Sequence, residues 1–327
     1  MQRYTNLSGI ALPLAVFLAT DDYDYEPGVI SATALIKPLR QMVLSKRVNP
    51  TEALVDISGL VSSRMGSAIH SALEKAWADP VAALKALGYP EKVYSNIRVN
   101  PTKELLADNP SAIPVYMEQR SYKSVGKYKL SGKFDFVAEG KVHDYKSTSV
   151  YSYLNQSNKD KYILQGSIYR WLNPEIITQD TMFIHYIFTD WSKAQALADP
   201  EYPQSRVFTQ ALALLSLEET QDYVENKLRQ FEKYQNAKEA EIPLCEDTDL
   251  WRKETVYKYY RDPSKTAGRS TKNFSSRAEA GARLAADGHK GVVLEVKGQV
   301  VACKYCPAFT VCSQKDVYIQ SGELVLD

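Results

Sequence analysis

The chain has 327 residues, of which 44% are apolar and 24% are charged, and its formal net charge is +1. These values are typical of a globular protein with a sizeable core, and the length suits two domains or one elaborated domain. They exclude a protein that attracts nucleic acid through its overall charge. Any surface that binds nucleic acid therefore has to be a local patch of positive charge.

The apolar run 10–20 is the best candidate for a membrane span. It is too short to cross a bilayer. One arginine precedes it and an acidic stretch follows it, which is unlike a signal peptide. We therefore expect a buried strand or strand pair here, no membrane partner, and a cytoplasmic protein. The four cysteines of such a protein are expected to be reduced thiols or metal ligands rather than disulfides.

Helical and strand-like segments follow in turn. Residues 31–47 predict a helix that a serine or threonine opens and Pro38 interrupts. Residues 51–77 predict more helix, because apolar residues from position 62 onward recur three and four apart. Residues 95–148 alternate between apolar and polar positions, with turn residues between the runs, which predicts an antiparallel meander.

Helices and strands also follow one another after residue 148. The expected elements are a helix over 158–172, a strand over 181–191, a loop over 194–207 and a helix over 216–237 that opens with a Ser-x-x-Glu capping box. From about residue 240 we expect two strands, a helix ending at Gly288 and a hairpin over 290–306.

These elements predict an α/β (α+β) fold: a core with a mixed central sheet flanked by helices, and a small C-terminal ββαβ unit that contains the cysteines. We expect an N-terminal extension at 1–28 packed on the core, the core at 29–239, and the cysteine-containing unit at 240–327. Residues 256–272 mix lysine, arginine and tyrosine. They could contact phosphates and stack on bases, or form a solvated hairpin.

Two strand-like stretches carry Asp135, Asp144 and Lys146, with Gly140 in a hairpin-length loop between them. Alternate positions share a face of a strand, so Asp144 and Lys146 point the same way, and Asp135 can lie across the hairpin from Asp144. Neighbouring carboxylates repel unless a cation lies between them, and Mg²⁺ or Mn²⁺ prefers oxygen ligands. A lysine beside them could position a water and stabilise charge on a phosphate. The alternative is a charged hairpin face on which Lys146 neutralises Asp144.

Two predicted helices supply further candidates. Gly66 and His70 are four residues apart, and a glycine inside a helix costs about 1 kcal/mol relative to alanine, which indicates a close backbone approach. His70 could join the carboxylates as a neutral imidazole ligand. Gln165 and Tyr169 share a helix face and could hold phosphate oxygens. The alternatives are a structural histidine and an ordinary amphipathic helix.

In chain order these residues form the motifs G-x-x-x-H, G-x-x-D, D-x-K and Q-x-x-x-Y, which are Gly66 with His70, Gly132 with Asp135, Asp144 with Lys146, and Gln165 with Tyr169. This succession resembles the RecB-like nucleases of the PD-(D/E)XK superfamily, a branch that includes many bacteriophage exonucleases. The resemblance implies a restriction-endonuclease-like core and a Mg²⁺- or Mn²⁺-dependent DNA exonuclease, of phage or bacterial origin, for DNA recombination, repair or degradation. The proline of the superfamily name is absent before Asp135, as is usual in this branch.

The resemblance also implies a role for each motif residue. His70, Asp135 and Asp144 would bind the metal ion, with help from the backbone carbonyl of Tyr145. Lys146 would orient or activate the attacking water.

Outside the metal site, the same resemblance implies that Gln165 and Tyr169 contact the DNA backbone near the scissile phosphate. Glu118 matches an acid that is often found on the corresponding strand, and we expect it to have a supporting role, as Gly66 and Gly132 do.

Two other functions stay open at this point. One is an endonuclease or junction-cutting enzyme with the same site, and the other is a non-catalytic DNA-binding module of nuclease-like fold. DNA is the expected partner in each case. A recombination or single-strand-binding protein and a second copy of the chain are further candidate partners, and a phage-encoded protein would act in the cytoplasm of the bacterial host.

The cysteines form a C-x2-C-x5-C motif with one more cysteine upstream, and the four are Cys303, Cys306, Cys312 and Cys245. Four thiolates suit either a zinc ion or an iron–sulfur cluster. In the resembled nucleases this motif looks like three of the four ligands of a [4Fe–4S] cluster, which favours iron. Many of those nucleases place the fourth cysteine before the nuclease motifs. This chain has none there, so Cys245 would be the fourth ligand, and the cluster would have a structural role.

Overall fold

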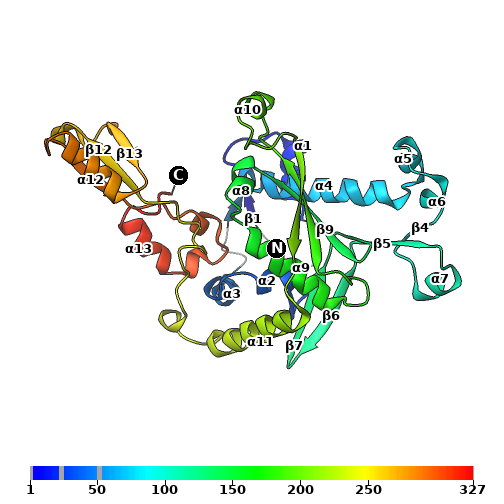
Figure 1. Cartoon of the computed structure of the whole chain (residues 1–327). Helices are drawn as coiled ribbons and strands as arrows, with labels where there is room; N and C mark the ends of the chain where they lie inside the picture. The colour runs from blue at the N-terminus through cyan, green and yellow to red at the C-terminus, as the bar shows by residue number, and fades with distance from the viewer. Residues whose placement is uncertain (1–2, 22–25, 50–53, 327) are drawn as a thin grey trace. The chain divides into compact units, whose positions relative to one another are not determined.

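The computed structural model describes residues 3–21, 26–49 and 54–326 (Figure 1). The chain divides into two compact units. The first consists of Met1–Lys37 and Leu54–Arg229, and the second of Pro38–Ala53 and Gln230–Asp327. The sequence placed the corresponding boundary at 239/240 and assigned the segment after Pro38 to the core. In the structure that segment belongs with the C-terminal residues.

A six-stranded mixed sheet forms the centre of the first unit, and the helices α4 and α9 flank it (Figure 1). The pairs β4–β5 and β9–β10 are parallel, and the other neighbours are antiparallel. In spatial order the strands are β11 (Val207–Ala213), β10 (Thr181–Phe188), β9 (Lys141–Thr148), β8 (Phe136–Ala138), β5 (Ile113–Met117) and β4 (Ile97–Val99). The predicted fold class, a mixed sheet flanked by helices, is therefore confirmed.

Two smaller sheets complete the strands of this unit. β1 (Arg3–Thr5) pairs in parallel with β3 (Leu54–Asp56). β7 (Tyr128–Lys133) lies between β2 (Val29–Ser31) and β6 (Arg120–Val125). The predicted meander over 95–148 is therefore only partly correct. β6 and β7 leave the central sheet, and β4 and β5 are parallel, which requires a crossover such as the one through α7 (Lys103–Asp108).

The helices of the first unit follow the predicted order with additions. They are α1 (Leu12–Ala19), α2 (Ala32–Leu35), the 3₁₀ helix η2 (Ile57–Leu60), α4 (Val61–Ala78), α5 (Val81–Ala86), α6 (Glu91–Tyr94), α7, α8 (Val150–Leu154), α9 (Lys159–Leu172), α10 (Lys193–Ala198) and α11 (Leu217–Tyr234), whose last residues belong to the second unit. The capping box of α11 is confirmed, because Ser216 N donates to Glu219 Oε2 and Glu219 N donates to Ser216 Oγ.

Three predictions for this unit are wrong. The run 10–20 is the helix α1 rather than a strand, and only Leu18 is buried in it. A continuous apolar run has no period that separates helix from strand, and Pro13 suits the first turn of a helix. The predicted loop 194–207 contains α10, which Ser192 caps through the backbone of Gln195. The strand β11 was not expected, because most of its residues are exposed and its polarity does not alternate cleanly.

The second unit contains the three-stranded sheet β13-β12-β14. Its elements are α3 (Leu39–Leu44), η1 (Ser45–Arg47), η3 (Glu239–Glu241), β12 (Val256–Tyr260), η4 (Pro263–Lys265), β13 (Lys272–Phe274), α12 (Arg277–Ala286), β14 (Val292–Val296), η5 (Ala302–Tyr305), η6 (Phe309–Val311) and α13 (Gln314–Gln320). The sheet has the expected ββαβ order. The hairpin expected over 290–306 is wrong, because β14 pairs with β12 and the chain after it forms short 3₁₀ turns.

Among the described residues, no helix combines the length and the apolar character that a membrane span requires.

Candidate active site

The two aspartates of the site lie opposite each other on the β8–β9 hairpin. Phe136 pairs with His143, which places Asp135 across from Asp144. The loop consists of Glu139 and Gly140, with φ angles of +50° and +73°. Two positive φ angles are what a two-residue type I′ turn requires, and this turn sets the register of the hairpin.

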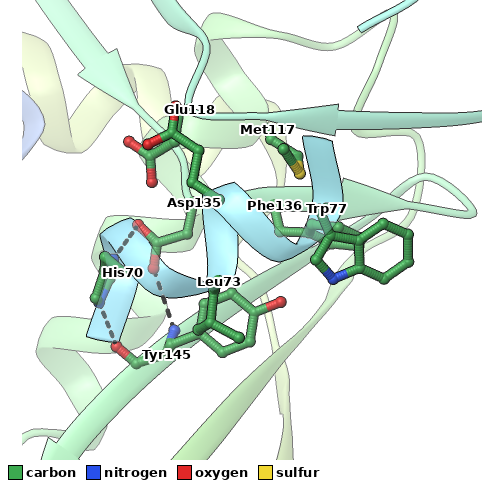
Figure 2. A pocket seen from close by; sticks show the side chains of 9 residues that line it. His70, Leu73, Trp77, Met117, Glu118, Asp135, Phe136 and Tyr145 are labelled. Atoms are coloured by element: carbon green, nitrogen blue, oxygen red, sulfur yellow. Dashed lines mark hydrogen bonds and ion pairs between the residues drawn. The ribbon is translucent and has the colours of Figure 1, made fainter. Parts of the chain in front are cut away.

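His70 reaches this hairpin from α4. Its Nδ1 lies 3.4 Å from Asp135 Oδ1, and its Nε2 lies 3.0 Å from the Tyr145 carbonyl oxygen (Figure 2). The Tyr145 N–H in turn donates to Asp135 Oδ2 over 3.1 Å. The Asp135 carboxylate is thus held on both oxygens, one by the helix and one by the neighbouring strand.

The contact between these two side chains shifts the pKa of each. The hydrogen bond to Asp135 raises the pKa of His70, although burial acts in the opposite direction. Burial alone would raise the pKa of Asp135, but the hydrogen bond and charge of His70 outweigh it and hold this pKa below its usual value. Asp135 is therefore ionised and ready to accept a cation.

Glu118 completes a three-residue group with His70 and Asp135. Each of the three offers one metal-ligating atom, and these atoms all lie within 4.8 Å of one another. Glu118 follows β5, its N–H donates to the Asp135 carbonyl oxygen, and it has a φ of +51°, which is uncommon for a residue other than glycine. Its Oε2 lies 2.7 Å from Lys133 Nζ. The sequence had given Glu118 only a supporting role.

Glu74 lies one helical turn beyond His70 on α4 and lines the same small pocket. The i, i+4 spacing from His70 was the sequence signal for it. Besides Glu118 and Asp135, it is the third acid at this pocket.

Asp144 is the most buried charged group of the site, with 1% of its surface exposed. Lys146 Nζ lies 2.6 Å from its Oδ2. Among the described residues, no donor meets hydrogen-bond geometry at this oxygen, so the contact is an ion pair. Burial raises the pKa of Asp144 to about 6. The pKa of Lys146 also lies above its usual value, because the charges of Asp144 and Asp135 outweigh its own burial.

Gln165 and Tyr169 project from α9 towards Asp144. Gln165 Nε2 lies 3.4 Å from Asp144 Oδ1 and donates to the Tyr169 hydroxyl over 2.8 Å. Both side chains are buried. Gly132 allows this packing, because a Cβ atom there would lie 3.0 Å from the Tyr169 ring and 2.6 Å from Leu172.

Gly66 lies where α4 passes β9. A Cβ atom at this position would lie 3.4 Å from Ser147 Oγ, which is an ordinary contact. The close backbone approach that the sequence suggested therefore exists, but it leaves room for a methyl group.

The donor set suits a hard divalent cation. Carboxylate oxygens are the ligands that Mg²⁺ and Mn²⁺ prefer, and an imidazole is compatible with Mn²⁺. Asp135 lies opposite Asp144 on the hairpin, and a cation near the two carboxylates would offset their repulsion. His70, Glu118 and Asp135 offer ligand atoms close enough together to hold such an ion, whereas Asp144 is not part of this group and is paired with Lys146.

None of the four cysteines of the second unit, all of which lie in the described part of the chain, forms a disulfide. Burial is the main cause that raises the pKa of Cys245 to about 12, and the charges of Asp249 and of the other three cysteines contribute to this value. The backbone of Cys245 is held by the buried side chain of Gln314, which accepts from its N–H and donates to its carbonyl, each over 2.9 Å. The four sulfurs are thus gathered in one place by residues far apart in the sequence.

The buried Arg40, from α3, belongs to the same cluster. Its Nε donates to Cys312 Sγ over 3.2 Å. Its Nη1 donates to the carbonyl oxygens of Glu239 and Ile242, and its Nη2 forms an ion pair with the Glu239 carboxylate. These bonds explain why the segment after Pro38 belongs with the C-terminal unit.

Of the two alternatives left open for 256–272, base stacking is not available to two of its tyrosines. Tyr259 and Tyr260 are buried, and the Tyr259 hydroxyl donates to Asp287. They belong to the core of the second unit because β12 is the central strand of its sheet.

No protein-family model and no curated protein matches the chain significantly. Solved structures with a significant match include that of SSO0001, which is 16% identical with a TM-score of 0.35 over 66% of this chain and 86% of that one. Another is a phage related exonuclease from Haemophilus somnus 129PT, which is 14% identical with a TM-score of 0.28 over 63% of this chain and 93% of that one. Similarity at this level does not establish a family.

Proposed function

We propose that the protein is a metal-dependent DNA nuclease that hydrolyses phosphodiester bonds. The observation that carries this proposal is the meeting of His70, Glu118 and Asp135 within 4.8 Å, beside the buried ion pair of Asp144 and Lys146. Carboxylates, an imidazole and a lysine in one place match the needs of metal-assisted hydrolysis better than those of a structural core.

In this proposal the side chains of His70, Glu118, Asp135 and Asp144 hold Mg²⁺ or Mn²⁺. The carbonyl of Tyr145 adds a further oxygen at the same point, where it now accepts from His70. A bound ion would polarise the phosphate and stabilise the charge that develops on it.

Lys146 orients the water and stabilises negative charge in this proposal. The two neighbouring carboxylates keep its ammonium protonated, so it donates hydrogen bonds rather than removing a proton. Asp144 holds the ammonium in place, and Gln165 supports the other oxygen of Asp144. Tyr169 and Gln165 are buried in the free protein, so their contact with a DNA phosphate requires the side chains that cover them to move.

We propose an exonuclease, and an endonuclease or junction-cutting enzyme with the same site and a non-catalytic DNA-binding module are the alternatives. We propose a role in phage or bacterial DNA recombination, repair or degradation. The bacterial cytoplasm suits this role, because cysteines stay reduced there and can act as metal ligands. A recombination or single-strand-binding protein and a second copy of the chain stay candidate partners.

For the four cysteines we propose a structural [4Fe–4S] cluster, with zinc as the alternative. Four thiolates on one zinc ion, with Zn–S bonds of about 2.3 Å, would lie about 3.8 Å apart. Among the described residues, the ligand atoms of His70, Glu118 and Asp135 all lie within 4.8 Å of one another. No three of the cysteine sulfurs in the described part of the chain lie that close together. A wider spacing of the sulfurs suits a four-iron cluster, because each thiolate binds a different iron.

Digestion of end-labelled linear DNA and covalently closed circular DNA with Mg²⁺ or Mn²⁺ tests the proposal. Wild type purified without air should shorten the linear DNA progressively and leave the circle intact, and Lys146→Ala should bind DNA but not cleave it. Cutting of the circle would favour the endonuclease. A folded, metal-loaded wild type that binds DNA and cleaves neither substrate would favour the binding module.

A further inference from the structure

The β6–β7 hairpin concentrates positive charge in a chain that is almost neutral. Residues 119–134, between the acids Glu118 and Asp135, contain no aspartate or glutamate. They contain five basic residues, which are Arg120, Lys123, Lys127, Lys129 and Lys133. The net charge of the whole chain is only +1, so this segment is a strong local exception.

One face of the hairpin packs against the rest of the first unit. Leu130 and Gly132 are buried on this face, and the Tyr169 ring from α9 lies directly against Gly132. Lys123 is on the same face, where its ammonium lies 3.8 Å from the centre of the Trp171 ring. This face is therefore packed at Leu130 and Gly132, and Lys123 is exposed but has its ammonium over the Trp171 ring.

The opposite face carries most of the basic residues and is exposed towards the tip, whereas Ser131 on this face is buried and accepts a hydrogen bond from Arg120 Nη1 over 3.2 Å. Arg120 pairs with Lys133 and Ser124 pairs with Lys129, so Arg120, Lys129 and Lys133 point to one side. Tyr122 lies between them and is 45% exposed. Lys127 follows at the exposed tip, beside Gly126. We call these five residues — Arg120, Tyr122, Lys127, Lys129 and Lys133 — the basic face.

The basic face starts at the candidate active site. Lys133 Nζ lies 2.7 Å from Glu118 Oε2, and Asp135 follows two residues after the end of β7. From there the six residues of β7 extend about 20 Å to the tip. That length corresponds to about six nucleotides of one strand of a duplex. In Figure 1 the strands β6 and β7 extend away from β9.

Two acids partly neutralise this face. Glu26 forms an ion pair with Lys129 over 2.9 Å, with both side chains about half exposed, and Glu118 pairs with Lys133. Exposed ion pairs contribute little, so a phosphate can replace Glu26 as the partner of Lys129. The basic side chains thus lie along a β-strand that runs from the candidate active site to the tip of the hairpin.

We propose that the basic face of the β6–β7 hairpin binds the phosphate backbone of the DNA strand whose end occupies the candidate active site. This proposal rests on the nuclease function proposed above. These contacts would not depend on the base sequence, because lysine and arginine bind the phosphates of DNA of any sequence. The hairpin would hold a long DNA so that its end stays in the candidate active site. A dinucleotide bound in that site would be too short to reach Lys127 and Lys129.

Binding of a fluorescent 24-nucleotide duplex, measured by anisotropy without divalent metal over a series of salt concentrations, tests the proposal. Lys127→Gln/Lys129→Gln should weaken binding about ten-fold, and the slope of log affinity against log salt should become shallower by about 2, one for each lysine. Glu26→Gln should tighten binding, because it removes the competing acid. Lys103→Gln changes a lysine that is 85% exposed on α7, away from the hairpin, and should change neither value.

Cleavage then separates this proposal from the nuclease function. With Mn²⁺, the ratio of kcat/KM for the 24-mer to kcat/KM for a dinucleotide should fall about ten-fold in the double variant and stay constant in Lys103→Gln. If wild type cleaves the 24-mer while the double variant keeps the wild-type ratio and salt slope, the hairpin proposal is overturned and the nuclease stands. If wild type cleaves neither substrate, the nuclease function fails first, and the salt slope alone then decides whether the hairpin binds DNA.

Discussion

Lys146 Nζ lies 2.6 Å from Asp144 Oδ2, and Asp144 is almost fully enclosed by the protein. A buried ion pair is seldom more stable than a well-packed apolar pair of the same size, because both ions lose their hydration. Its presence here, beside His70, Glu118 and Asp135, is easier to explain by chemistry than by stability.

Breaking this ion pair should destabilise the fold as well as stop cleavage. Lys146→Met leaves the buried Asp144 without its countercharge, and a loss of about 3–5 kcal/mol in the free energy of unfolding is expected. In Asp144→Leu/Lys146→Met most of that stability should return while cleavage stays absent. Urea unfolding monitored by fluorescence measures both variants. A double variant as unstable as Lys146→Met would argue against an ion pair with a catalytic purpose.

A bound divalent ion should stabilise the native state. At a concentration 100 times the dissociation constant, Mn²⁺ should add about 2.7 kcal/mol to the free energy of unfolding. Glu118→Gln and Asp135→Asn should each remove most of this gain, whereas Glu104→Gln on the exposed helix α7 should keep it. Urea titrations with and without Mn²⁺ give these values. An equal gain in all four proteins would place the ion elsewhere.

Asp144 should make the stability of the metal-free protein depend on pH. Burial raises its pKa to about 6, whereas an aspartate in an unfolded chain titrates near about 3.9. Between these values the native state keeps a proton that the unfolded state has released. The contribution of Asp144 to stability therefore falls as the pH rises from about 4 to about 6.

The free energy of unfolding of wild type minus that of Asp144→Asn isolates this effect from other titrations. This difference should decrease with rising pH over that range. A difference that stays constant, or rises, would show that burial does not control the Asp144 carboxyl group.

Arg40 should tune the cysteine site through its bond to Cys312 Sγ. A positive donor at a cluster sulfur stabilises the reduced, more negative form, so Arg40→Gln should lower the reduction potential. Iron analysis, the visible spectrum and electrochemistry of protein purified without air supply the readouts. Lys304→Gln, on η5 within the C-x2-C segment, is the control for a general change of charge. One zinc ion and no iron in the wild-type protein would contradict the proposed iron–sulfur cluster. A reduction potential that does not change in Arg40→Gln would contradict the proposed role of this arginine.

Gly132 should be intolerant of any side chain. A Cβ atom there would press on Leu172 and the Tyr169 ring, so Gly132→Ala should cost about 1–3 kcal/mol. Gly59→Ala is the matched control, because no atom lies within 4 Å of the added methyl group there. Thermal unfolding compares the two, and equal stabilities would mean that α9 moves aside easily.

Much of the candidate site follows from local sequence rules. Asp135 and Asp144 lie opposite each other because a two-residue turn fixes the register of β8 and β9. Asp144 meets Lys146 because alternate residues share a face of a strand. Gln165 bonds Tyr169 because residues four apart are neighbours on a helix. Each of these relations lies within one element or one tight hairpin.

The sequence by itself therefore determined the hairpin, the helices that carry His70 and Gln165, and the mixed class of the fold. Only the tertiary structure decided that Glu118 joins His70 and Asp135 and that Arg40 lies against Cys312. The physical reason is range. Periodicity and turn chemistry act between near neighbours, whereas these contacts join residues that only the packing of whole elements brings together.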